Sequence, residues 1–135
     1  MELGIGKGYL TKKFAENNTK KVERFNKYLK IIKEALEVYN IKVTAGEIFN
    51  SGYQGFTFYV KGIKCLIIEQ DGKTGLEDHS IGYVEVMVKE SRNIIIKHRD
   101  RRFGDTRLNE EELKWVEENV VDEVIKLLVI NGVKI

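Results

Sequence analysis

The chain has 135 residues, of which 42% are hydrophobic and 33% are charged, and its formal net charge at pH 7 is +2. This length fits one domain, and this composition excludes a chain that is disordered throughout. No apolar run is long enough to span a bilayer, and the first residues lack the apolar core of a signal peptide. We therefore expect one domain, located in the cytoplasm and without a membrane partner.

Charge is distributed unevenly along the chain. Residues 1–33 contain nine Lys or Arg and three Glu, and residues 89–107 contain seven Lys or Arg and three acidic residues. Residues 108–126 reverse this balance, with seven acidic residues and two Lys. The chain thus has two basic segments, which suit an anionic partner, and one acidic segment.

Residues 1–18 predict a basic arm ahead of a folded domain, residues 19–135. The arm combines three glycines with Lys7, Lys12 and Lys13 and shows no sustained apolar period, a composition often found in mobile termini.

A long helix is predicted after the arm, because apolar residues recur at spacings of three and four and Thr19 can cap the start. Two apolar seams run side by side along this helix. They consist of Val22, Phe25, Leu29, Ile32, Leu36 and Tyr39, and of Tyr28, Ile31, Ala35 and Val38. Two seams exceed what one contact with a sheet needs, so we expect a homo-oligomer formed through this helix.

The middle of the chain predicts a sheet of four or five strands. Between Ile41 and His98 the apolar period shortens toward two, and turn residues separate the runs. Short connections between successive strands allow only antiparallel pairing. The predicted strands are 41–48, 56–60, 63–70, 83–89 and 94–98, and alternation assigns Phe56 and Phe58 to the core.

A second long helix is predicted at the end of the chain. Asn109 and Glu112 have the spacing of a capping box, and Gly132 stops the helix. The expected class is therefore α+β, with a small antiparallel sheet flanked by a long N-terminal and a long C-terminal helix.

No motif predicts a catalytic residue, a metal ligand or a cofactor. Gly72-Lys73-Thr74 lacks the glycine that a phosphate-binding loop requires at position 67, where Ile67 stands. Cys65 lies in an apolar run, which predicts a buried thiol, and Cys65, His79 and His98 are too few and too scattered for a zinc site.

The candidate binding site is a basic cluster at the end of the last predicted strand. Guanidinium groups bind phosphate in a bidentate fashion, and an adjacent aromatic ring can stack on a base. Alternatively, these arginines pair with the acidic last helix on a solvated surface. Two tyrosines beside the strands could also line a site. The candidate ligand-binding residues are Lys97, His98, Arg99, Arg101, Arg102, Phe103, Arg107, Tyr53 and Tyr83.

The order of these parts resembles that of small phage-encoded anti-defence proteins, especially a type II anti-CRISPR inhibitor with a basic arm. The similarity rests on Gly6-Lys7, Lys12-Lys13-Phe14, the strand entry from Tyr53 to Phe56, and the segment from Gly82 to Lys89. The architecture also resembles phage proteins that sequester cyclic nucleotide signals of defence systems such as Thoeris, whose active form is an assembly. Both resemblances imply a non-enzymatic counter-defence protein in the host cytoplasm. The implied partner is a nucleotide ligand or a nucleic-acid-bound host nuclease.

Two other functions stay open from the sequence. One is a small metal-dependent nuclease or phosphodiesterase that uses His79 or His98, and the other is a generic nucleic-acid-binding protein. Metal-dependent cleavage of oligonucleotides would favour the first.

Overall fold

The computed structural model describes residues 2–73, 79–102 and 107–135, and within these ranges it leaves out the side chains of residues 71–73, 79–81 and 99–102. The described chain has an α+β fold. Its elements are, in order, β1 (Gly4–Ile5), α1 (Tyr9–Asn17), α2 (Thr19–Glu37), β2 (Val43–Ser51), β3 (Tyr53–Val60), β4 (Ile63–Lys73), β5 (His79–Val88), β6 (Ser91–Arg102) and α3 (Glu110–Ile130). None of the described helices has both the length and the apolarity needed to cross a membrane.

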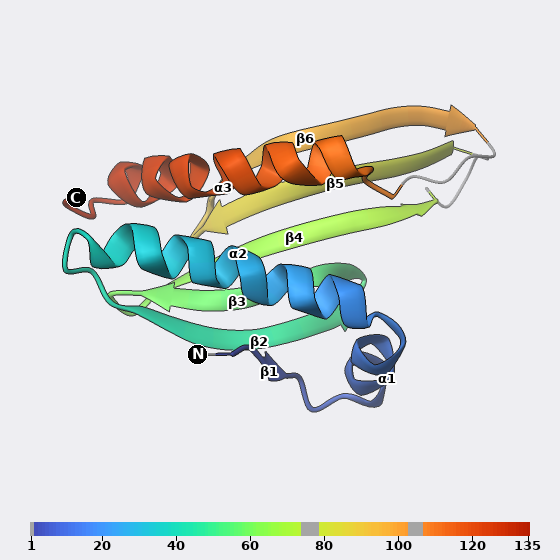
Figure 1. The fold of residues 1–135 in the computed structure, drawn as a ribbon, viewed down its shortest axis with the longest axis horizontal. Coiled ribbons are helices and arrows are strands. Elements are labelled where there is room, and N and C mark those ends of the chain that lie inside the picture. The colour runs from blue at the N-terminus through green and yellow to red at the C-terminus, as the bar shows by residue number, and fades with distance from the viewer. Residues whose placement is uncertain (1, 74–78, 103–106) are drawn as a thin grey trace.

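The strands form one mixed sheet whose spatial order follows the chain, from β1 at one edge to β6 at the other (Figure 1). Strands β2 to β6 pair antiparallel, each with the next, as the short connections predict. β1 pairs parallel with β2, with Gly4 opposite Glu47. The prediction of four or five antiparallel strands is therefore correct in part. It misses β1, because a two-residue strand is too short to produce a periodic pattern.

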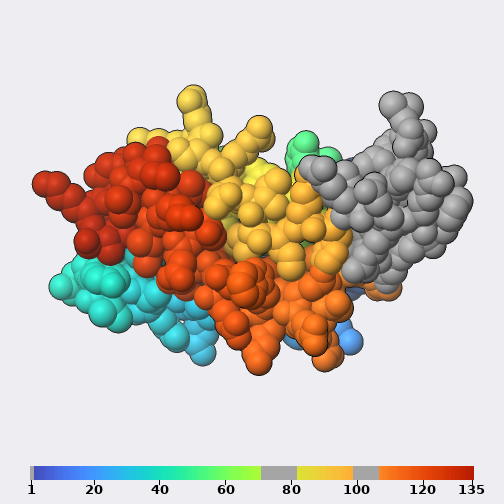
Figure 2. Space-filling model, turned by 90° about the horizontal axis from the view of Figure 1, so that it is seen from above, coloured from blue at the N-terminus to red at the C-terminus, as the bar shows by residue number. Residues whose placement is uncertain are grey.

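Helices α2 and α3 lie side by side on one face of the sheet, α2 over β2 and β3, and α3 over β5 and β6 (Figure 1). Figure 2 shows α3, in red and orange, beside the yellow surface of β5 and β6, with the cyan end of α2 next to it. We call this face the helix face and the opposite one, which neither α2 nor α3 covers, the open face.

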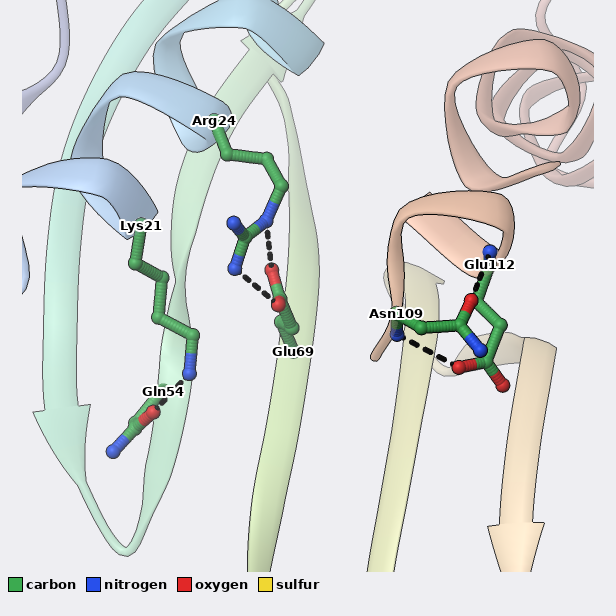
Figure 3. Close-up of polar contacts among 6 residues, drawn as sticks. All are labelled: Lys21, Arg24, Gln54, Glu69, Asn109 and Glu112. Atoms are coloured by element: carbon green, nitrogen blue, oxygen red, sulfur yellow. Dashed lines mark hydrogen bonds and ion pairs between the residues drawn. The ribbon is translucent and has the colours of Figure 1, made fainter. Parts of the chain in front are cut away.

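The two long helices confirm the prediction of a helix at each end of the domain, with one difference at a cap. The N-cap of α2 is Asn18 rather than Thr19, and no side-chain capping bond forms there. The capping box of α3 is present: Glu112 N–H donates to Asn109 Oδ1 at 2.9 Å, and Asn109 N–H donates to Glu112 Oε1 at 2.8 Å (Figure 3).

The core lies between the helix face and the two long helices. Phe25 of α2 stacks on Phe56 with ring centroids 5.3 Å apart, and Phe56 lies 5.9 Å from Phe58. All three side chains are fully buried, which confirms the alternation predicted for β3. Cys65 is fully buried too, and burial raises the pKa of its thiol to about 12, so this cysteine belongs to the core.

The segment predicted as a basic arm contains β1 and α1 and packs onto the domain. Leu3, Phe14 and Ala15 are buried, and the Leu3 N–H donates to Asn26 Oδ1 of α2 at 2.8 Å. The sequence hid this helix because α1 spans nine residues, about two and a half turns, which offers few positions for an apolar stripe.

The second apolar seam of α2 is partly used inside the domain. Tyr28 is fully buried and Ile31 and Ala35 are half-buried, whereas Val38, beyond the helix end at Glu37, is 79% exposed. Self-association through α2 therefore stays a prediction, with less free apolar surface to support it than the sequence suggested.

The close approach of β3 to β4 at Gly55 gives a first test of the fold. A Cβ at this position would lie 2.1 Å from the Ile67 carbonyl oxygen and 3.0 Å from the Phe49 ring. We expect Gly55→Ala to lower the free energy of unfolding by about 3 kcal/mol or more, measured by urea denaturation. Gly4→Ala is the matched control, because its Cβ would meet nothing closer than 3.6 Å. Equal losses in both variants would contradict the packing described.

Candidate functional site

A pocket with a basic lining lies at the start of α2, and we call it the basic pocket. Its volume is about 390 Å³. Its cations come from two regions far apart in the sequence, the first turns of α2 and the segment before α3. The lining residues are Asn17, Asn18, Thr19, Lys20, Lys21, Arg24, Glu69, Arg107 and Leu108.

One wall of the basic pocket is an ion pair between α2 and β4, in which the carboxylate is buried and the guanidinium is partly exposed. Arg24 Nε donates to Glu69 Oε2 at 3.0 Å, and Arg24 Nη2 donates to Glu69 Oε1 at 2.5 Å (Figure 3). Glu69 is only 2% exposed, and the guanidinium fork provides its charge compensation. Burial, with the Glu69 carboxylate adding to it, raises the pKa of the neighbouring Tyr28 hydroxyl.

Lys21 and Lys20, adjacent in sequence, differ in their surroundings. Lys21 is 7% exposed, and its Nζ donates to Gln54 Oε1 of β3 at 2.6 Å, which fixes the start of α2 to the sheet (Figure 3). Lys20 and Arg107 are exposed at the pocket. The first N–H groups of α2 add the positive end of the helix dipole. Four cations and one carboxylate therefore give the basic pocket an excess of positive charge.

The predicted neighbours Lys97 and His98 point to opposite faces of the sheet. His98 lies opposite Gly82 on the helix face, where its Nε2 pairs with the Glu112 carboxylate. Lys97 lies opposite Tyr83 on the open face and is exposed. Glu112 therefore takes part in both the capping box and the contact with β6, and its pairing with His98 connects α3 to the sheet.

The remaining residues of the predicted cluster are divided between described and undescribed parts of the chain. Arg99, Arg101 and Arg102 belong to β6, with Arg101 opposite Ser80, but their side chains lie outside the described residues. Phe103 also lies outside the described residues, whereas Arg107 lines the basic pocket. The phosphate contacts predicted for the three arginines stay predictions.

The two predicted tyrosines come together at a second pocket, on the open face, which we call the open-face hollow. Its volume is about 410 Å³, and it is lined by Phe49, Ser51, Tyr53, Leu66, Ile68, Tyr83, Glu85, Met87 and Arg92. Desolvation raises the pKa of Tyr83; Glu85 and Tyr53 add to the rise and Arg92 opposes it, so these groups are electrostatic neighbours.

Several site residues escaped the sequence analysis. The sequence analysis identified a basic segment at the start of the chain but did not single out Lys20, Lys21 and Arg24. A count of charges does not show which cations of the segment lie in the same pocket as Arg107. The acidic residues of the two pockets, Glu69 and Glu85, gave no signal at all in the strand pattern.

Within the described ranges, no three His, Cys, Asp or Glu side chains lie close enough together to hold a metal ion. Comparison with known proteins adds nothing to this picture, because no protein family, no curated protein and no solved structure matches the chain. The chemistry of the two pockets therefore has to be inferred from their geometry.

Because of the Arg24–Glu69 pair, Arg24 and Lys20 of α2 should contribute very differently to the free energy of unfolding. Arg24→Ala leaves a buried carboxylate without its main partner and should lower the free energy of unfolding by about 3–5 kcal/mol. Lys20→Ala removes an exposed charge and should change it by less than about 0.5 kcal/mol. Urea denaturation measures both, and adding Glu69→Gln to Arg24→Ala should restore part of the loss. Similar values for the two single variants would refute the structural role of the pair.

Proposed function

We propose that the protein is a non-enzymatic binding protein for a phosphate-bearing target, and that the basic pocket holds the phosphate. The observation that carries this proposal is the convergence of Lys20, Lys21, Arg24 and Arg107 on one pocket, where Glu69 is the single carboxylate among the described lining residues. Phosphate is the common biological anion that such a set of cations, at the start of a long helix, would bind most strongly.

The charge excess does not depend on any one of these cations being unpaired. Glu69 is compensated by Arg24, and Lys21 is held at its place by Gln54, so two of the positive charges, those of Arg24 and Lys21, are held in position before a ligand arrives. A site whose charges are already in position loses little conformational entropy on binding. Lys20 and Arg107 are exposed at the same pocket, where an incoming anion can reach them.

Two targets share this chemistry, a small nucleotide signal and a nucleic-acid-bound nuclease. The pocket volume of about 390 Å³ lies within the range of small-molecule sites, which favours the nucleotide. A counter-defence role, in which the protein sequesters such a signal inside the host cell, remains part of the proposal through the resemblance of its organisation. Against a His98-dependent enzyme stands the pairing of His98 with Glu112.

Removal of either exposed cation should weaken ligand binding. We expect Lys20→Ala and Arg107→Ala each to lower the affinity for ADP or a short single-stranded oligonucleotide roughly tenfold to a hundredfold, because each removes a charge-assisted contact. Isothermal titration calorimetry measures the affinity, and added salt should weaken binding further. Arg99→Ala, Arg101→Ala and Arg102→Ala should behave alike if these arginines also contact phosphate.

Lys30→Ala is the matched control, since Lys30 is an exposed lysine of the same helix that does not line the basic pocket. Unchanged affinity in both Lys20→Ala and Arg107→Ala would refute the phosphate site. Mass spectrometry of the ligand after incubation tests the non-enzymatic part. Hydrolysis that is lost on a single substitution in either pocket would overturn it.

A further inference from the structure

The open-face hollow contains a carboxylate, that of Glu85, which has no hydrogen-bond or ion-pair partner among the described residues. Glu85 is 9% exposed, and among the described residues its carboxylate makes no hydrogen bond and no ion pair. Its neighbours across the sheet are Ile68 on β4 and Ile94 on β6, which are both apolar. Buried charged groups are normally paired, because desolvation without compensation is costly. A carboxylate in this position is therefore a candidate for contact with a ligand.

Two acceptors at this part of the sheet, Glu85 and Gln70, have no hydrogen-bond donor among the described residues. Gln70 lies directly opposite Tyr83, and its Oε1 is buried without a hydrogen-bond partner in the described structure. Arg92 lies diagonally from Glu85, opposite Met87, but does not reach ion-pair distance. A ligand that enters the hollow would gain most by bringing N–H donors of its own.

The walls of the hollow suit a flat ring. Tyr53 is 55% exposed and Tyr83 is half-buried, and Phe49 adds a third aromatic side chain. Gly55 leaves room for the Phe49 ring, since a Cβ there would lie 3.0 Å from its Cζ atom. Leu66, Ile68 and Met87 give the remaining surface an aliphatic character. Aromatic side chains of this kind stack on nucleobases.

Aromatic walls and a carboxylate could accept either an organic cation or a base attached to phosphate. The positive charges around the hollow favour the second of these ligands. An organic cation would suit the rings and Glu85, but it would meet Arg92, which is exposed in the hollow. Lys97, opposite Tyr83, is also exposed on the same face. A base attached to phosphate places its donors against Glu85 and its negative charge near Arg92 and Lys97.

Among the bases, guanine matches a single carboxylate best. Its Watson–Crick edge offers two adjacent N–H donors, on N1 and on the 2-amino group, which can meet the two oxygens of one carboxylate. Adenine offers one donor, on its 6-amino group, beside the N1 acceptor, which a carboxylate repels. Inosine keeps the N1 donor and lacks the 2-amino group.

We propose that the open-face hollow binds a guanine base, stacked on Tyr53 and Tyr83 and read by Glu85, as part of a free nucleotide or of a single-stranded nucleic acid. This site is distinct from the basic pocket. Glu69 of the basic pocket lies on the helix face of β4, whereas Ile68, the next residue, lies on the open face opposite Glu85. The proposal adds base recognition to the phosphate binding proposed above and does not depend on it.

Selectivity among three nucleotides tests the proposal with the unchanged protein. By isothermal titration calorimetry we expect GMP to bind roughly tenfold or more tightly than AMP, with IMP between them. Glu85→Gln, which keeps the shape of the side chain, should remove most of the preference for GMP over AMP. Tyr83→Ala should lower the affinity for all three nucleotides about tenfold, because it removes a stacking surface. Tyr39→Ala is the control, since Tyr39 is an exposed tyrosine outside the hollow.

Two further probes separate the sources of the base and the two proposed sites. Oligothymidine with a single guanine, compared with plain oligothymidine, tests recognition within a strand, and GMP tests recognition of a free nucleotide. A guanine preference in either arm supports the site and identifies the source. Inorganic pyrophosphate carries no base, so its binding reports on phosphate contacts alone. Equal affinity for GMP and AMP together with equal affinity for the two oligothymidines would overturn the proposal, as would a guanine preference that survives Glu85→Gln in a folded variant.

Discussion

The burial of one face of the sheet under α2 and α3 determines where each functional group can lie. Because side chains alternate along a strand, covering one face sends Val84 and Val86 into the core and leaves Tyr83 and Glu85 on the other side. Polar groups on the helix face have to be paired there, as His98 is with Glu112. On the open face, aromatic and charged side chains gather around one hollow.

The packing of the two long helices on the sheet also determines which residues line the basic pocket, because the pocket lies at the start of α2 and next to the segment before α3. α2 begins over the same part of the sheet as Glu69 and Gln54, so its first cations are directed toward acceptors on two strands (Figure 3). The salt bridge from Lys27 to Glu117, 2.9 Å long, joins α2 to the acidic helix α3. Some acidic residues of α3 thus pair with residues of α2 and β6. The sequence had offered these acidic residues as alternative partners of the arginine cluster.

Local patterns explain which parts of the fold were predictable. The five strands β2 to β6, the burial of Phe56 and Phe58, and the capping box of α3 follow from periodicity or from residues four positions apart or fewer. β1 and α1 are too short to show a period. The sites depended on contacts between distant segments, so a cluster that is continuous in sequence, such as Lys97 and His98, divides between two faces, whereas Arg107 joins cations from the other end of the chain.

Glu69 and Glu85, on adjacent strands of the sheet, differ in their partners. They lie one register position apart on adjacent strands, since Glu69 is opposite Val84 and Ile68 is opposite Glu85. Glu69 is 2% exposed and is held by the Arg24 fork, so its charge contributes to joining α2 to the sheet. Glu85 is 9% exposed and has no such partner among the described residues, although a valine or threonine would fit the strand without the cost of burying a charge. Packing alone gives no reason for a carboxylate at this position, whereas the guanine site proposed above would give it a partner.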